Sequence, residues 1–320
     1  MNVAFAGVFA GHVAERVRAR LRVPCRVTVA DDREIVGRLG DVDVLVTMAF
    51  TREMAAAAPR LRLVQVPGAG LDRIDREALP PGAALANAYG HDTGIAEYVL
   101  GAMLALGRSF CRLDAALRRG RWESVWSGSA VPLWPELAGQ TLGILGYGRI
   151  GQAVARRALA FDMEVLAIRR DLSQPDPHRL AFLRGPDALD EVLGRADHLA
   201  ITLALTPDTR GLIGARALAL MKPTAFVINV ARGEVLDEDA LYEALAGGAI
   251  AGAALDVWYR YPVEGAPTPP GHRPFHTLPN VLMTPHVSGW TEGMMEARAG
   301  IIAENVHRVA RGEEPVNLIR

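Results

Sequence analysis

The segment from Thr141 to Arg170 constrains the fold of this chain more than any other. An apolar run is followed by Gly146, Gly148 and Gly151 in the spacing G-x-G-x-x-G, then by a helical pattern whose apolar face is Ile150, Val154 and Leu159, and then by a second apolar run. In such strand–turn–helix units the first glycine allows a tight turn, the second lets the backbone approach a pyrophosphate, and the third lets the helix pack on the strand. Free N–H groups at the start of the helix then face the phosphates. The segment therefore predicts a dinucleotide-binding site, which includes Arg149 and Ile150.

The end of the second apolar run, Met163–Ile168, indicates which dinucleotide binds. An acidic residue there binds the ribose hydroxyls of NAD, whereas an arginine accommodates the 2′-phosphate of NADP. Arg169 and Arg170 follow the run, so the sequence predicts NADP. Two observations leave NAD open. Lys222 is the single lysine, so nearly all positive charge in this chain is arginine, and Asp171 follows the arginine pair directly.

The whole chain limits the class of protein. Its 320 residues favour two domains, and a hydrophobic content of 50% with 22% charged residues is typical of a soluble globular enzyme. The net charge of −1 and the lack of a basic stripe argue against nucleic acid as a partner. Apolar runs stop short of the ~18 residues of a membrane helix, and the apolar start lacks the basic residues of a signal peptide. Two cysteines predict no disulfide framework and no metal site, and they fit the cytoplasm.

The rest of the chain alternates strand-like and helix-like segments, which predicts a doubly wound α/β fold. A long helix is expected over Gly94–Arg119, followed by a connector over Gly120–Gly139. The other expected helices include Val13–Leu21 and Thr51–Ala57. The expected strands outside the glycine-turn segment are Val3–Ala6, Arg26–Ala30, Val44–Met48, Leu63–Val66, Ala83–Ala86, His198–Leu203, Ala225–Val230, Gly252–Val257 and Val281–Met283.

Short polar motifs follow several of these strands. They are Thr206-Pro-Asp-Thr209, Asn229-Val-Ala-Arg232-Gly233, Ala254-Leu-Asp256-Val257, Thr284-Pro-His286-Val-Ser-Gly289 and, in the first third, Gly68-Ala-Gly70-Leu-Asp72-Arg-Ile-Asp75 with Ala96-Glu97. Together with the glycine turn, in this order, they resemble the D-isomer-specific 2-hydroxyacid dehydrogenase family, which includes glyoxylate/hydroxypyruvate reductases and formate dehydrogenase.

The resemblance implies an α/β fold of two doubly wound Rossmann-like domains with a cleft between them. Residues 1–95 plus 290–320 would form a flavodoxin-like, substrate-binding domain, and residues 96–289 a dinucleotide-binding Rossmann domain. It also implies a homodimer joined through Gly94–Arg119 and its connector.

Reduction of a 2-oxo acid needs a clamp for the substrate, a proton donor and a hydride source. A guanidinium at Arg232 can hold a carboxylate in a two-pronged contact and polarise the ketone. His286 can donate the proton, because an imidazole with a pKa of about 6.5 transfers protons near neutrality. These two residues are the predicted clamp and acid/base.

The family's third catalytic group differs in this chain. A carboxylate normally lies five residues after the aspartate of the Leu-Asp-Val motif, and formate dehydrogenases have glutamine there. Here the position is Tyr261, which can orient an imidazole but carries no charge at neutral pH. We therefore expect a His286 pKa near or below its ordinary value. Glu264, three residues on, is an alternative partner.

The resemblance implies further contacts. Asp256 and the backbone of Ala231 would bind the nicotinamide carboxamide, and Thr206 would also contact the cofactor. A simple turn aspartate is the alternative for Asp256. The N–H groups of Ala69 and Gly70 would bind the substrate carboxylate. The loop Met48–Thr51 has no Arg or Lys, which argues against a phosphorylated substrate. Trp290 would form an apolar wall, and Trp126 or Trp134 would reach the partner's site, unless these tryptophans only pack.

The leading hypothesis is therefore NADPH-dependent reduction of a small 2-oxo acid, such as glyoxylate or hydroxypyruvate, to the D-2-hydroxy acid. Two alternatives stay open at this point. One is formate-dehydrogenase-like hydride abstraction, and the other is a dinucleotide-sensing protein that has lost turnover with the missing carboxylate.

Overall fold

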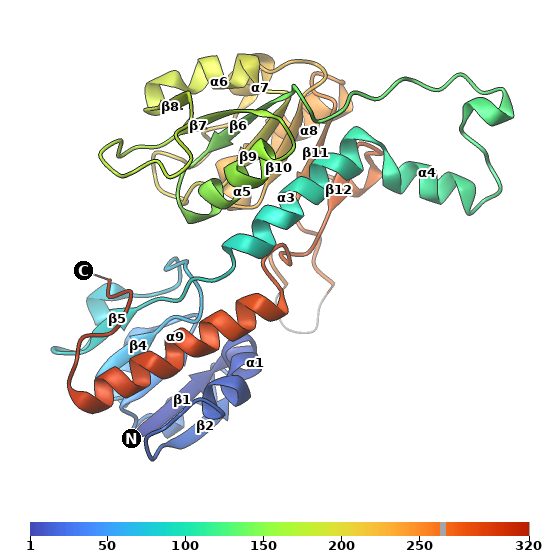
Figure 1. Cartoon of the computed structure of the whole chain (residues 1–320). Helices are drawn as coiled ribbons and strands as arrows, with labels where there is room; N and C mark the ends of the chain where they lie inside the picture. Colours follow the sequence, from blue (N-terminus) through green and yellow to red (C-terminus); the bar gives the residue numbers. More distant parts are fainter. Residues whose placement is uncertain (263–266, 320) are drawn as a thin grey trace. The chain divides into compact units, whose positions relative to one another are not determined.

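The computed structural model describes residues 1–262 and 267–319. The chain divides into two compact units (Figure 1). Unit 1 consists of residues 1–91 and 290–320, and unit 2 is the continuous segment 92–289. Within the described residues no helix is both long and apolar enough to cross a membrane.

Unit 1 is built on a five-stranded parallel sheet in the order β2-β1-β3-β4-β5. This is a doubly wound order, with a switch point between β1 and β3. The strands are almost wholly buried except for the edge strand β2, so they are apolar without alternation, as expected of a parallel sheet covered on both faces. Their bounds are β1 Asn2–Ala6, β2 Arg26–Ala30, β3 Val44–Thr47, β4 Leu63–Gln65 and β5 Ala84–Ala86.

The first and last helices of the chain share one face of this sheet. Helix α1 (Gly7–Arg18) and helix α9 (Glu292–Arg311) pack on each other and on β1, β3 and β4 through one apolar cluster. Helix α2 (Arg52–Ala57) belongs to the cluster on the other face. After α9 the chain returns to the sheet, where Leu318 pairs antiparallel with Ala86 of β5. Unit 1 thus takes its core from both ends of the sequence.

Unit 2 is built on a seven-stranded parallel sheet in the order β12-β11-β10-β9-β6-β7-β8. Counted from β6, this is the Rossmann order, and its switch point lies between β6 and β9. The bounds are β6 Thr141–Leu145, β7 Glu164–Ile168, β8 Phe182–Arg184, β9 His198–Ile201, β10 Phe226–Asn229, β11 Gly252–Leu255 and β12 Val281–Met283.

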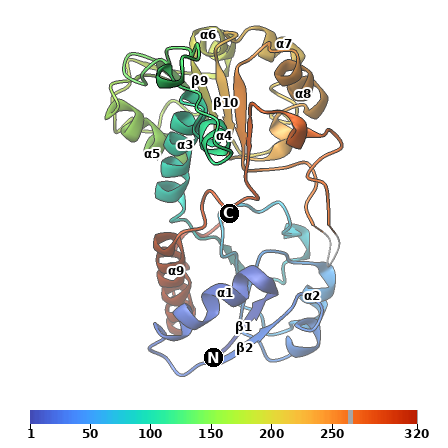
Figure 2. The ribbon, with the colours of Figure 1, turned by 90° about the vertical axis from the view of Figure 1, so that its right-hand side faces the viewer.

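Helices cover both faces of the second sheet (Figures 1 and 2). Helices α3 (Asp92–Gly107) and α5 (Arg149–Leu159) pack on one face. The other face carries α6 (Leu189–Arg195), α7 (Ala215–Ala219) and α8 (Glu238–Ala246). The two α/β sheets confirm the predicted fold class.

Three local predictions were wrong. The expected helix Gly94–Arg119 is two helices, because the chain turns at Ser109, whose φ of 52° is left-handed, before α4 (Phe110–Leu117) begins. Strand β8 was not predicted, since only one of its three residues is buried and the apolar run that overlaps it, Leu180–Leu183, is short. Leu159, taken as part of the inward face of α5, is exposed, and that face consists of Gly151, Val154, Ala155 and Ala158.

Candidate functional site

The three glycines between β6 and α5 each have a distinct structural reason. Gly146 has a φ of 101°, and a Cβ there would lie 2.9 Å from the backbone of Thr202. At Gly151 a Cβ would lie 2.3 Å from the carbonyl oxygen of Gly146, so the helix rests directly on the turn. A Cβ at Gly148 would meet no atom of the described residues within 4 Å. The turn is closed where glycine serves packing and open where a pyrophosphate would approach, which fits a dinucleotide.

Arg169 ties down the loop that follows β7. Its Nη1 donates to the Pro175 carbonyl at 3.1 Å, Nη2 donates to the Gln174 carbonyl, and its Cζ lies 5.8 Å from the centroid of the Tyr147 ring. The Tyr147 hydroxyl, from within the glycine turn, donates to Asp176 at 2.8 Å. These contacts connect the glycine turn to the loop after β7.

Arg170 and Asp171 differ from Arg169 in their surroundings. Arg170 is exposed. The Asp171 carboxylate accepts hydrogen bonds from Ser173 and Gln174, and these contacts lower its pKa. Of the two predicted cofactor arginines, Arg169 is therefore partly buried and bound to its own loop, and Arg170 is exposed.

Arg232 stands directly after β10 in a loop fixed by its neighbours. The Asn229 side chain accepts from the Ala231 N–H at 3.0 Å and donates to the Arg232 carbonyl at 2.9 Å. Gly233 follows without a side chain because a Cβ would lie 2.5 Å from the carbonyl oxygen of Trp258. This close contact holds the loop after β10 against the loop after β11, so the guanidinium starts from a defined backbone position.

Asp256, at the end of β11, organises the turn that carries His286. It is 0% exposed. Its Oδ1 accepts from the Thr284 hydroxyl at 2.6 Å and the Val287 N–H at 2.9 Å, and its Oδ2 accepts from the Ser288 N–H at 2.9 Å. These bonds surround His286, whose φ is 58°, a left-handed conformation that costs energy in a non-glycine residue. Asp256 therefore has the hydrogen bonds expected of a turn aspartate, the alternative given above. Its contact with nicotinamide stays a prediction.

His286 is paired with the side chain that replaces the family carboxylate. The Tyr261 hydroxyl lies 2.8 Å from Nδ1 of His286, while Nε2 forms no hydrogen bond within residues 1–262 and 267–319. Desolvation lowers the pKa of His286, the Arg232 charge lowers it further, and the Asp256 charge opposes both. Burial raises the pKa of Tyr261, so its hydroxyl stays neutral near pH 7. The alternative partner Glu264 lies outside the described residues.

The remaining predicted site residues lie on separate loops. Thr206 forms a turn with Thr209, whose hydroxyl accepts from the Thr206 N–H at 2.7 Å. In unit 1, Ala69 and Gly70 follow β4 and are partly buried, and their N–H groups donate to no acceptor within the described residues.

The tryptophans differ in exposure. Trp290 belongs to unit 1 and packs edge-on against Phe9 and His12, at 5.5 Å between ring centroids in each case. Trp126 is 88% exposed on the connector, and Trp134 lies beside Arg108. Whether any of these tryptophans contacts substrate stays a prediction.

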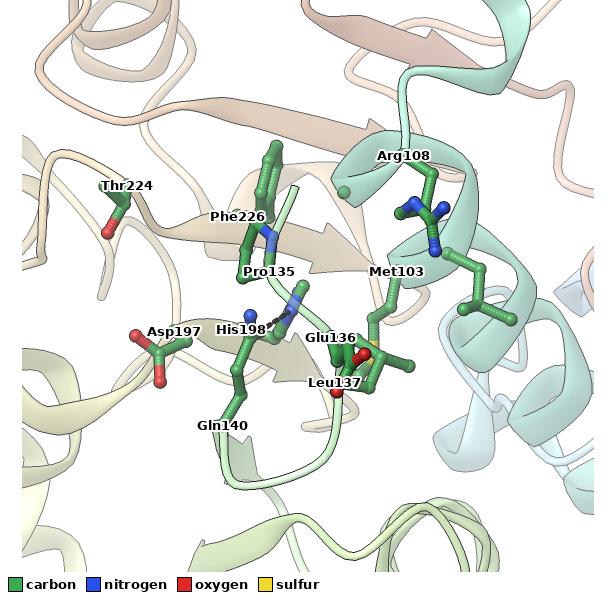
Figure 3. Close-up of a pocket in the computed structure, with 12 residues that line it drawn as sticks. Met103, Arg108, Pro135, Glu136, Leu137, Gln140, Asp197, His198, Thr224 and Phe226 are labelled. Atoms are coloured by element: carbon green, nitrogen blue, oxygen red, sulfur yellow. Dashed lines mark hydrogen bonds between the residues drawn. The ribbon is translucent and has the colours of Figure 1, made fainter. Parts of the chain in front are cut away.

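A cavity of about 380 Å³ lies at the end of the unit 2 sheet where its strands begin (Figure 3). It is lined by residues at the beginnings of β9 and β10, whereas the glycine turn, Arg232 and His286 follow strand ends. His198 in its wall bonds Gln140 at 2.7 Å, and burial lowers the His198 pKa to about 4. The cavity is thus separate from the predicted catalytic residues.

Two Rossmann-like sheets, the fitted glycine turn and the histidine at a strand end define a dinucleotide-dependent oxidoreductase. A sequence profile of the "D-isomer specific 2-hydroxyacid dehydrogenase, NAD binding domain" matches residues 100–288. The chain belongs to the D-isomer specific 2-hydroxyacid dehydrogenase family.

Two curated relatives span most of the chain. It is 37% identical to a glyoxylate reductase of Pyrococcus furiosus over 89% of this chain and 84% of the relative. It is also 37% identical to a D-3-phosphoglycerate dehydrogenase of Methanocaldococcus jannaschii over 89% of this chain, but it spans only 53% of that longer protein.

Two solved structures show the same fold. The NADPH-dependent glyoxylate/hydroxypyruvate reductase of Sinorhizobium meliloti, in complex with NADP and sulfate, superposes with a TM-score of 0.78 at 26% identity, over 99% of this chain and 98% of that one. The NAD-dependent formate dehydrogenase of Staphylococcus aureus, in complex with NAD, gives 0.79 at 26% identity, over 100% and 99%. The family therefore uses a nicotinamide dinucleotide, and these two structures hold different ones.

Sequence reasoning missed two features of the site. The hydrogen bonds that Asp256 makes to the His286 turn depend on the pairing of β11 with β12 and have no local signal. Arg298, a buried arginine beneath the Gly68–Gly70 loop, lies in the apolar pattern of α9 far along the chain. A charged residue on the buried face of an amphipathic helix was the available signal.

Proposed function

We propose that this protein reduces a small 2-oxo acid of the glyoxylate or hydroxypyruvate type to the D-2-hydroxy acid, with NADPH as reductant. The observation that carries the proposal is the environment of His286. Tyr261 holds Nδ1, and Nε2 has no hydrogen-bond partner in the described part of the chain. A histidine with one nitrogen held and the other open is suited to give a proton to a substrate oxygen.

The chain's residues divide the reaction between them. The nicotinamide, when bound, supplies the hydride to the carbonyl carbon. Arg232 binds the carboxylate and polarises the ketone, and Nε2 of the His286 imidazolium gives its proton to the ketone oxygen. The carbonyl thus gains a hydride at carbon and a proton at oxygen, which yields the alcohol and neutral imidazole. The N–H groups of Ala69 and Gly70 are proposed as further contacts for the carboxylate.

Tyr261 sets how easily His286 is protonated. A carboxylate beside Nδ1 would stabilise the imidazolium by its charge, whereas a neutral hydroxyl only accepts a hydrogen bond from it. The lowered pKa of His286 agrees with this difference. We therefore expect the reductase to work best on the acidic side of neutrality.

The glycine turn with Arg149 and Ile150, and the loops at Thr206 and Ala231, are proposed to hold the dinucleotide. For the 2′-phosphate we favour Arg170 over Arg169. Arg169 already donates to the Pro175 and Gln174 carbonyls, whereas Arg170 is exposed. Arg170→Ala should weaken NADPH binding about 10- to 100-fold and leave NADH binding unchanged, since a charge-assisted phosphate contact is worth ~1.5–3 kcal/mol. Titration of both nucleotides tests this, and a wild-type preference for NADH would refute NADP selectivity.

A homodimer is proposed through helix α4 and the connector after it. Figure 1 shows this segment reaching away from the sheet of unit 2. It exposes large apolar side chains, including Leu133 at 100% and Trp126 at 88%. Apolar side chains gathered on one projecting segment mark a surface for association. Light scattering of the purified protein checks the stoichiometry.

Steady-state assays with NADPH or NADH and a panel of 2-oxo acids test the proposed reaction, with NAD and formate as a separate arm. Reduction of a 2-oxo acid to the D-isomer is the expected result. Formate oxidation without 2-oxo acid reduction would identify the formate-dehydrogenase-like alternative. Tight nucleotide binding with no turnover in either arm would identify a sensing protein.

A further inference from the structure

Arg298, on helix α9 in unit 1, is a buried charge with no counter-charge in the part of the chain that the structure describes. The residue is 8% exposed. Its Nη2 donates to Nδ1 of His91 at 3.1 Å, and its Cζ lies 5.2 Å from the centroid of the Phe9 ring. Its Nε is buried without a hydrogen-bond partner, and within residues 1–262 and 267–319 no carboxylate forms an ion pair with it. Buried charges are normally paired, so this guanidinium needs an explanation.

The guanidinium lies behind the Gly68–Gly70 loop. A Cβ placed on Gly68 would be 4.0 Å from Nη2 of Arg298. Two carbonyls of the loop are already satisfied: the Gly68 carbonyl accepts from the Ala88 N–H at 3.1 Å, and the Ala69 carbonyl accepts from the Asn87 side-chain amide at 3.1 Å. Its donors are not, since the N–H groups of Ala69 and Gly70 have no acceptor in the described residues. Successive free N–H groups form an anion-binding concavity.

We propose that Arg298 supplies the positive charge for a carboxylate bound at the N–H groups of Ala69 and Gly70, and thereby makes unit 1 select negatively charged substrates. This inference rests on the proposed function and extends it to the charge of the substrate. The bound carboxylate is the counter-ion that the described residues do not supply. Burial lowers the pKa of Arg298 to about 10, still far above neutrality, so the charge is retained. Arg298 acts through space behind the loop and is a positioning residue.

The test compares an acid with its uncharged counterpart, glyoxylate against methyl glyoxylate. In Arg298→Met, kcat/KM for glyoxylate should fall about tenfold or more, mainly through KM, because the buried positive charge that attracts the bound carboxylate is lost. The value for the ester should stay within about twofold, since the ester has no charge to stabilise. Arg298→Lys should recover part of the loss. Arg62→Met is the matched control, because it removes an arginine at the other end of β4 and should leave kcat/KM for both substrates unchanged.

Thermal unfolding separates this role from a structural one. Removal of an unpaired buried charge removes its desolvation cost, so Arg298→Met should melt no lower than the wild type. With NADPH present, oxalate should raise the Tm of the wild type and not that of Arg298→Met. Equal losses for acid and ester, unchanged values for both, or equal oxalate shifts would overturn the inference. If the wild type reduces no 2-oxo acid but the oxalate shift depends on Arg298, the proposed reaction fails and this anion site stands.

Discussion

The same substitution, glycine to alanine, should have different effects at two positions of the glycine turn. At Gly151 it should lower stability, and at Gly148 it should weaken cofactor binding. At Gly151 the new Cβ would lie 2.3 Å from the Gly146 carbonyl oxygen, more than 1 Å closer than the 3.4 Å at which ordinary contact begins. Overpacking of this kind costs ~1–3 kcal/mol, which is roughly 2–12 °C in Tm for a unit of this size. Helix propensity alone favours alanine over glycine by ~1 kcal/mol, so any destabilisation reports the clash.

Gly148 should behave in the opposite way. Its φ of −89° and ψ of −157° suit any L-residue, and its Cβ would meet no atom of residues 1–262 and 267–319 within 4 Å. Gly148→Ala should therefore leave the Tm of the nucleotide-free protein within ~1–2 °C, because an uncrowded surface substitution changes stability little. The Cβ would instead stand where the pyrophosphate approaches. A steric cost of ~1–3 kcal/mol corresponds to roughly 5- to 150-fold weaker NADPH binding.

The assay is differential scanning fluorimetry without nucleotide, together with NADPH titration by calorimetry. Gly194→Ala is the matched control, because that glycine is also helical and its Cβ would come no closer than 3.8 Å to Leu220. It should leave NADPH binding unchanged and raise the Tm by only about 2–4 °C, because helix propensity favours alanine by ~1 kcal/mol and no clash opposes it. If Gly148→Ala binds NADPH as tightly as the wild type, the turn does not hold a pyrophosphate. If Gly151→Ala has the same Tm as the control, the stability of helix α5 does not depend on this contact.

Three further predictions concern single side chains. Arg232→Ala should abolish most turnover and leave NADPH binding nearly intact, with poor rescue by lysine because only arginine offers a planar fork; a variant that loses NADPH would show that the residue contacts the cofactor. Because reduction needs the His286 imidazolium, kcat/KM should fall as the pH rises through the lowered pKa of His286, below its ordinary value of about 6.5. Tyr261→Glu should move this fall to higher pH, whereas Tyr261→Phe should lower the rate only modestly. A fall at the same pH in the wild type and in Tyr261→Glu would contradict the pairing of His286 with Tyr261. The pKa of His198 is lowered to about 4, so the unfolded chain binds the extra proton, and stability should drop by roughly 3 kcal/mol as pH falls from 6.5 to 4; denaturant titrations of wild type and His198→Gln check this, and equal slopes against pH would refute it.

Most of the fold could be predicted because parallel strands covered on both faces are short, continuous apolar runs. Arg26–Ala30 and Val281–Met283 have the bounds predicted from the sequence, and most others differ by one or two residues. The errors lie where this signal fails. The turn at Ser109 interrupts an apolar helical pattern that continues on both sides, and β8 is an edge strand of three residues with only one of them buried.

For the site, residues at a fixed spacing along the chain could be predicted, whereas contacts between residues far apart in the sequence could not. Counting five residues from Asp256 led to Tyr261, and the structure places this hydroxyl 2.8 Å from His286. The contacts of Arg169 with its own loop were out of reach, because they depend on how residues after the strand fold back. Arg298 was missed for a related reason, since its neighbours Phe9 and His91 come from distant parts of the sequence.

The split composition of unit 1 has a consequence for synthesis on the ribosome. Its first 91 residues emerge early, but α9, which fills one face of their sheet, belongs to the last 31 residues. Unit 2 lies between them as one continuous segment, and at 5–20 residues per second its translation takes roughly 10–40 s. During that interval the nascent N-terminal sheet exposes the apolar face made by residues such as Phe5 and Val44, while unit 2 can complete its own core. Unit 2 can therefore complete its core before unit 1 does, although synthesis of unit 1 begins first, and the uncovered face of the early sheet is a surface prone to aggregation until α9 arrives.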